Sequence, residues 1–138
     1  MISEHDEQKA LIKAWNSYAA LHGIDEKLLF AIPNGGKRNV ITARVMKSEG
    51  VRAGVPDLFL ALPRGGYHGL FIEMKKEKGG VVSDEQKEYI QILRENGYDA
   101  GVCHGYKEAL SAVIQYLELY VKDVYDELQD QESKENNQ

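Results

Sequence analysis

Two apolar segments, residues 57–62 and 68–75, are separated by only five residues, two of which are glycines. A connection this short cannot cross over a sheet, because parallel strands need a dozen or more residues between them. The two segments are therefore predicted to form an antiparallel hairpin. With a five-residue loop, the residue numbers of facing positions add up to 130, so Asp57 falls opposite Glu73.

These two acids stand within otherwise apolar strands. Alternation with period two places Phe71, Glu73 and Lys75 on the same face of the second strand. The Cβ atoms of facing residues lie about 4.5–5.5 Å apart, so the two carboxylates repel each other unless a cation lies between them. A divalent ion held by oxygen ligands is one solution, and Lys75 is another. The plainer interpretation of the Glu-x-Lys triplet is an exposed ion pair.

The remaining segments predict a mixed sheet with helices on both sides, that is, an α/β fold. Ser83 and Gln86 fit a capping box, which marks the start of one helix. Residues 1–128 are expected to form one domain, and residues 129–138 an acidic disordered tail without apolar anchors. The expected helices cover residues 3–21, 39–49, 83–96 and 106–124, and the expected further strands cover residues 28–32 and 99–104.

Composition places the chain among ordinary globular proteins, with 43% apolar and 28% charged residues. Cys103 is the only cysteine, so no internal disulfide can form, and a buried thiol in a reducing cell is expected. No apolar run approaches the roughly 20 residues of a membrane span, and the acidic N-terminus does not resemble a signal peptide. A cytoplasmic protein with no membrane partner is therefore expected.

The net charge of −5 is concentrated at one end of the chain. From Glu118 onward there are seven acidic residues against two lysines, so the rest of the chain is neutral. Residues 34–80 contain nine basic and four acidic residues. Because salt screens charges beyond about 8–10 Å, this local excess matters more to a phosphate than the total does. A solvated basic surface is the alternative interpretation.

Taken together, these motifs resemble the PD-(D/E)xK nucleases and, more narrowly, the virus-type replication-repair nuclease domain, VRR-NUC. Five short motifs occur in the expected order over about residues 3–117. They are Glu4 with Gln8, Pro33-Asn34-Gly35-Gly36-Lys37-Arg38, Gly54-Val55-Pro56-Asp57, residues 69–75 ending in Glu73-Met74-Lys75, and Ser83 with Gln86.

The resemblance implies a restriction-endonuclease-like fold and hydrolysis of phosphodiester bonds with Mg²⁺ or Mn²⁺. Asp57, Glu73 and a main-chain carbonyl near Met74 would hold the metal, with Glu4 completing the site directly or through water. Lys75 would stabilise the developing charge or orient the attacking water. Glu7 lies one turn from Glu4 and is the other candidate. An exposed first-turn acid favoured by the helix dipole explains Glu4 equally well.

Two further motifs are candidates for nucleic-acid binding. Asn34, Gly35 and Gly36, followed by Lys37 and Arg38, can present main-chain N–H groups and two cations to a phosphate at a helix start. The same residues also form an ordinary turn. Gln86 has both interpretations as well, since it is the capping-box partner of Ser83.

The expected activity is therefore a metal-dependent nuclease that acts on DNA, selective for branched, flapped or Holliday-junction structures. One alternative is a catalytically silent nucleic-acid-binding module of the same fold, and another is a sequence-specific restriction-type endonuclease. Small members of the family are often phage-encoded, which suggests a bacterial or phage-infected cell. A junction with two symmetric scissile phosphates suggests a homodimer. Its candidate interface contains tyrosines that are equally well explained as core residues: Tyr116, Tyr120 and Tyr125.

Overall fold

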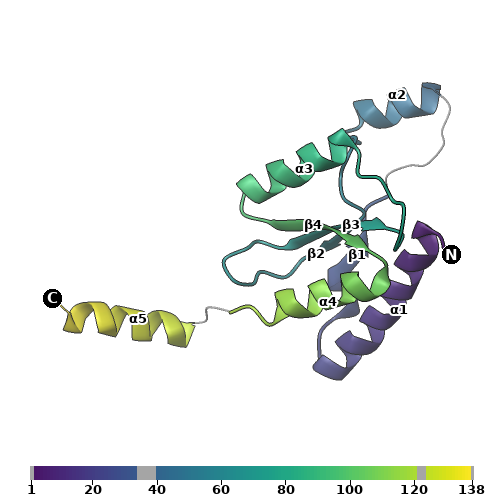
Figure 1. The fold of residues 1–138 in the computed structure, drawn as a ribbon. Helices are drawn as coiled ribbons and strands as arrows, with labels where there is room; N and C mark the ends of the chain where they lie inside the picture. Colours follow the sequence, from purple (N-terminus) through teal and green to yellow (C-terminus); the bar gives the residue numbers. More distant parts are fainter. Residues whose placement is uncertain (1, 34–39, 121–123, 138) are drawn as a thin grey trace.

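The computed structural model describes residues 2–33, 40–120 and 124–137. Its centre is a four-stranded sheet in the order β1-β2-β3-β4, covered by helices on both faces (Figure 1). The first three strands pair antiparallel, and β3 and β4 pair in parallel. The predicted α/β fold with a mixed sheet is confirmed. The strands are β1 (Leu29–Ala31), β2 (Leu58–Leu60), β3 (Leu70–Lys75) and β4 (Asp99–His104).

The hairpin between β2 and β3 has the register predicted from its loop length. Leu58 faces Ile72 and Leu60 faces Leu70, and all four side chains are buried. Extended by one position beyond the paired residues, this register puts Asp57 opposite Glu73, on the other face of the sheet from these four apolar side chains. The apolar core thus fixes where the acids stand.

Helices α1 (Glu4–His22) and α4 (Tyr106–Leu117) cover the core face of the sheet and pack against each other (Figure 1). The Ser3 side chain accepts a hydrogen bond from the Asp6 N–H at the start of α1, as an N-cap should. Trp15 is fully buried, and its indole N–H donates to the Glu26 carbonyl in the 3₁₀ turn Glu26–Leu28. Trp15 is therefore a core residue.

Helix α3 (Asp84–Glu95) lies over the other face against β4, and α2 (Val40–Ser48) lies beside it (Figure 1). The capping box of Ser83 and Gln86 is present. Gly54 adopts a positive φ of 87°, and a Cβ there would lie 2.3 Å from the Glu85 carbonyl oxygen. Only glycine lets this segment approach the start of α3 so closely, which places Asp57 beside that helix.

The C-terminal region differs from the predictions in two respects. A single helix through residue 124 and a disordered tail over 129–138 were expected, whereas α4 ends at Leu117 and a separate helix, α5, covers Val124–Asn136. Helix α4 ends because the next residues turn onto the hairpin loop, where the Gly65 N–H donates to the Tyr120 carbonyl. The tail is rich in Glu, Gln and Lys, which favour helix even with exposed side chains, as those of residues 128–137 are.

Two more expectations concern single residues. Cys103 is buried, and burial raises the pKa of its thiol to about 11, so it is the small apolar residue that was expected. Tyr116 is also buried, and its hydroxyl donates to the Leu62 carbonyl at 2.6 Å. It is therefore a core residue and not part of an interface. Over the described parts of the chain, no helix is both long and apolar enough to cross a bilayer.

Candidate active site

Asp57 directly precedes β2 and accepts hydrogen bonds from two main-chain N–H groups. Its carbonyl accepts a hydrogen bond from the Ile32 N–H at 2.7 Å, which ties it to the end of β1. Its side-chain Oδ2 accepts from the Met74 N–H, also at 2.7 Å. The Asp57 carboxylate therefore lies over β3, next to Glu73.

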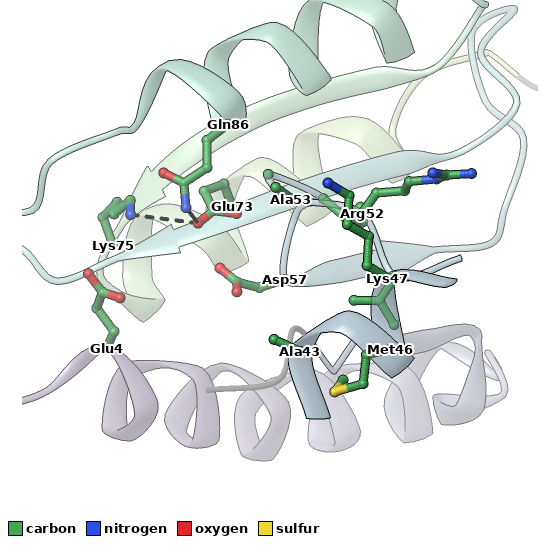
Figure 2. A pocket seen from close by; sticks show the side chains of 13 residues that line it. Glu4, Ala43, Met46, Lys47, Arg52, Ala53, Asp57, Glu73, Lys75 and Gln86 are labelled. Atoms are coloured by element: carbon green, nitrogen blue, oxygen red, sulfur yellow. Dashed lines mark hydrogen bonds and ion pairs between the residues drawn. The ribbon is translucent and has the colours of Figure 1, made fainter. Parts of the chain in front are cut away.

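Glu73 is only 3% exposed. Its Oε1 accepts a hydrogen bond from Gln86 Nε2 at 2.7 Å and lies 3.6 Å from Lys75 Nζ (Figure 2). Its Oε2 is buried and has no hydrogen-bond partner among the described residues. A buried polar atom without a partner is costly, so this oxygen is a candidate ligand for a cation.

The two carboxylates disturb each other electrostatically. Burial, followed by the charge of Asp57, raises the pKa of Glu73 to about 8, although the charge of Lys75 lowers it. Burial also raises the pKa of Asp57, against the hydrogen bond from the Met74 N–H, which lowers it. Lys75 alone therefore does not neutralise the pair, and a second positive charge would stabilise it.

Oxygen ligands and an unsatisfied carboxylate oxygen fit a hard divalent cation. The described residues contain no group of three or more His, Cys, Asp or Glu side chains arranged to hold a metal. Mg²⁺ does not require one, because it keeps several waters and is often bound through one or two carboxylates. Met74 could contribute only main-chain atoms, since its side chain is buried in the core.

The two first-turn acids of α1 occupy different environments. Glu4 lines the same cavity as Asp57 and Glu73, and its charge raises the pKa of both (Figure 2). Glu7 is 3% exposed, and its Oε2 accepts from the Tyr106 N–H at the start of α4 at 2.6 Å. The structure thus brings Glu4 to the acid pair and uses Glu7 to cap α4.

Gln86 combines the two roles that its sequence position left open. Its Oε1 accepts from the Ser83 N–H at 2.9 Å, which closes the capping box of α3. Its Nε2 donates to Glu73. The start of α3 is therefore joined directly to the acid pair, so Gln86 lies in the site whether or not it contacts nucleic acid.

The acids lie in an open cavity of about 570 Å³. Its far side includes Lys47 at the end of α2 and Arg52 in the loop that follows (Figure 2). Neither residue stood out in the sequence except as part of the basic stretch 34–80, because a lysine or arginine in that stretch does not reveal which way it faces. Asn34, Gly35, Gly36, Lys37 and Arg38 lie outside the described residues, so their role in binding stays a prediction.

Comparison with known proteins gives a consistent result. The model of the VRR-NUC domain family matches residues 2–107. A solved structure described as a VRR_NUC domain protein is 31% identical, with a TM-score of 0.77 over 89% of this chain and 94% of that chain. No curated protein sequence matches. The region matched by the family model contains the three acids of the cavity, Glu4, Asp57 and Glu73.

Proposed function

The chain belongs to the VRR-NUC family of nuclease domains, and on this premise we propose that it is a Mg²⁺- or Mn²⁺-dependent endonuclease that hydrolyses DNA phosphodiester bonds. The observation that carries the proposal is the buried pair Asp57 and Glu73, with an unsatisfied carboxylate oxygen and Lys75 beside it. Buried acids with raised pKa values in a cavity are typical of catalytic sites. A surface ion pair would show neither feature.

Asp57 and Glu73 would hold the metal, together with the main-chain carbonyl of Met74, and Glu4 would act directly or through water. A divalent ion bound there would polarise the scissile phosphate and lower the pKa of a bound water. Asp57 is kept in place by the Met74 N–H, and Glu73 by Gln86, so the protein positions both acids before any ligand binds. Such preorganisation avoids a reorganisation cost during the reaction.

Lys75 supplies the cation on the other side of Glu73. Its ammonium group lies 3.6 Å from Glu73 Oε1 and lines the cavity, so it can donate hydrogen bonds to a phosphate oxygen or to a water beside it. Charge that develops on the phosphate during bond cleavage is stabilised most by a donor already fixed in place. We assign Lys75 this catalytic role.

For the substrate we propose branched, flapped or Holliday-junction DNA. Over residues 2–33, 40–120 and 124–137 there is no long insertion that could read a base sequence. The cavity is lined by cations that suit the phosphate backbone: Lys47, Arg52 and Lys75. A four-way junction has two symmetric scissile phosphates, and one small domain cannot reach both. We therefore propose that the working unit on such a junction is a homodimer.

The deciding experiment incubates the protein with Mg²⁺ or Mn²⁺ and labelled single strands, duplex, flap and four-way junction. Cleavage should require the metal and stop with EDTA. Asp57→Asn and Glu73→Gln should each abolish it, because either change removes a charged ligand, while circular dichroism shows a native fold. Cleavage in EDTA, or full activity of Asp57→Asn, would contradict the proposal. Binding without cleavage of any substrate would favour the catalytically silent binding module.

A further inference from the structure

The cavity that contains the acids extends beyond them to an apolar wall. One face of α2 forms this wall, because Ala43, Met46 and Lys47 are spaced three and four residues apart. Figure 2 shows Ala43 and Met46 on α2, across the cavity from Glu73. Val45 belongs to the same helix but does not line the cavity, and its side chain is 49% exposed.

The loop after α2 continues the wall and is anchored at both ends. At its start, the Val51 N–H donates to the Met46 carbonyl at 3.0 Å, and Gly50 makes the turn with a φ of 101°. At its end, Gly54 is pressed against the first turn of α3. Val51, Arg52 and Ala53 therefore line the cavity from a loop that is held at both ends.

An apolar part of the substrate, next to a phosphate, would fit against this wall. Phosphate and metal chemistry use only the polar side of the cavity, which leaves Met46 and Val51 without a function there. In a DNA strand, the groups next to a phosphate are the sugar and the base. A base in a duplex is stacked and paired inside the helix, whereas an unpaired base is free to contact a protein side chain.

We propose that this wall is a subsite for the sugar and base of an unpaired nucleotide adjacent to the scissile phosphate. Met46 and Val51 contact the nucleoside, and Lys47 and Arg52, both exposed at the rim, pair with the flanking phosphates. The inference rests on the proposed nuclease function for the position of the scissile phosphate. It narrows the substrate to DNA in which a nucleotide at the site is unpaired, as in a flap or at an opened branch point.

The test compares two oligomers of equal length and charge, oligothymidylate and an abasic chain, by fluorescence anisotropy in EDTA. The native protein should bind oligothymidylate about tenfold more tightly than the abasic chain, because contact between the base and Met46 buries a few apolar groups. Met46→Ala should reduce this preference to about twofold or less. Met46→Leu keeps apolar volume and should restore it.

Two controls separate the wall from general effects. Val45→Ala lies on the same helix outside the cavity and should keep the native preference. Lys47→Gln with Arg52→Gln should weaken binding of both oligomers equally and lower the salt dependence, because these residues are assigned to phosphates.

Equal binding of both oligomers by the native protein, or binding of neither, overturns the inference. So does a Val45→Ala variant that behaves like Met46→Ala. Because binding is measured without metal, the result is independent of cleavage. A base preference that depends on Met46, in a protein that cleaves nothing, would support the subsite while contradicting the nuclease proposal.

Discussion

Glu73 is the residue at which burial and charge conflict most strongly. An apolar side chain would satisfy the strand pattern at this position. Instead a carboxylate stands there, with one oxygen bound by Gln86 and the other without a partner in the described parts of the chain. Proteins accept such local costs mainly at functional sites, where a ligand or substrate supplies the missing partner. The structural cost and the proposed metal site are therefore two aspects of the same arrangement.

This conflict predicts how stability depends on pH in the absence of metal. The pKa of Glu73 rises from an ordinary 4.5 to about 8 on folding, so the folded state binds more protons between these values. The contribution of Glu73 to stability is therefore fully present below about pH 4.5 and is lost as the pH rises through about 8. In EDTA, thermal scans should show a melting temperature that declines by several degrees from pH 5 to 8.5.

Glu73→Gln should flatten this decline, because the amide does not ionise and also relieves Asp57 of a neighbouring charge. Glu88→Gln changes an exposed acid on α3 and should follow the native curve. A native protein whose melting temperature rises over this range, or a Glu73→Gln variant that declines as steeply, would show that Glu73 ionises normally.

Lys75 is expected to act on turnover and not on affinity. Lys75→Ala should lower kcat by at least about a hundredfold, a loss typical of removing one fixed donor to transition-state charge. Binding of the same DNA should change little. Lys78→Ala removes an exposed lysine nearby and serves as the matched control. Changing Lys37 and Arg38 together should instead weaken binding and flatten its salt dependence. The assignment fails if Lys75→Ala affects only the dissociation constant.

Among the elements, α3 begins at the active site. Two variants at its start should therefore have different effects, one on stability and the other on activity. Ser83→Ala removes the cap and should cost about 1 kcal/mol of stability with little change in kcat. Gln86→Glu keeps a residue that fits the capping box but replaces the donor to Glu73 with a repelling carboxylate. It should retain the fold and lose about tenfold or more in kcat, as measured by denaturant unfolding and steady-state cleavage.

Native kcat in Gln86→Glu would show that Gln86 acts only as a cap. If both variants lose stability and activity in parallel, activity depends on the integrity of the start of α3. The hydrogen bond from Gln86 to Glu73 then has no separate role.

The hairpin shows how much of the site can be predicted from sequence. A five-residue loop and strict alternation determine which residues face each other, so Asp57 and Glu73 could be paired without coordinates. Whether Glu4 or Glu7 joins them could not be decided in this way. Both acids lie in the first turn of α1, and their environments depend on how α1 crosses the sheet and meets the start of α4.

The C-terminal helices show the opposite case. The apolar spacing continues past residue 117, so periodicity alone predicted one helix where the structure has two. The end of α4 depends on a tertiary contact, the hydrogen bond from the Gly65 N–H to the Tyr120 carbonyl. Such a contact cannot be predicted from the sequence around the end of the helix. For the same reason the basic stretch did not reveal Lys47 and Arg52 as cavity residues.

At the scale of the whole molecule, charge is divided between two ends. Figure 1 shows α5 on the side of the molecule away from α2. Helix α5 carries much of the acidic C-terminal segment, whereas Lys47 and Arg52 line the cavity near α2. Because charges farther apart than about 8–10 Å are largely screened, the acidic helix does not cancel the attraction of DNA to the cavity. A net charge of −5 is thus compatible with a nucleic-acid substrate.

The size of the domain leads to the last prediction, which is that the protein acts on four-way junctions as a homodimer. A domain of roughly 115 residues has a radius of gyration of about 14 Å, so a single cavity cannot occupy two symmetric scissile phosphates at once. An isologous dimer would match the twofold symmetry of the junction. Light scattering at micromolar concentration should give twice the mass of one chain, and both strands should be cut in one encounter. A monomer that cuts both strands in one encounter would refute the dimer, whereas a monomer that nicks only flaps or single strands would exclude junctions as the substrate.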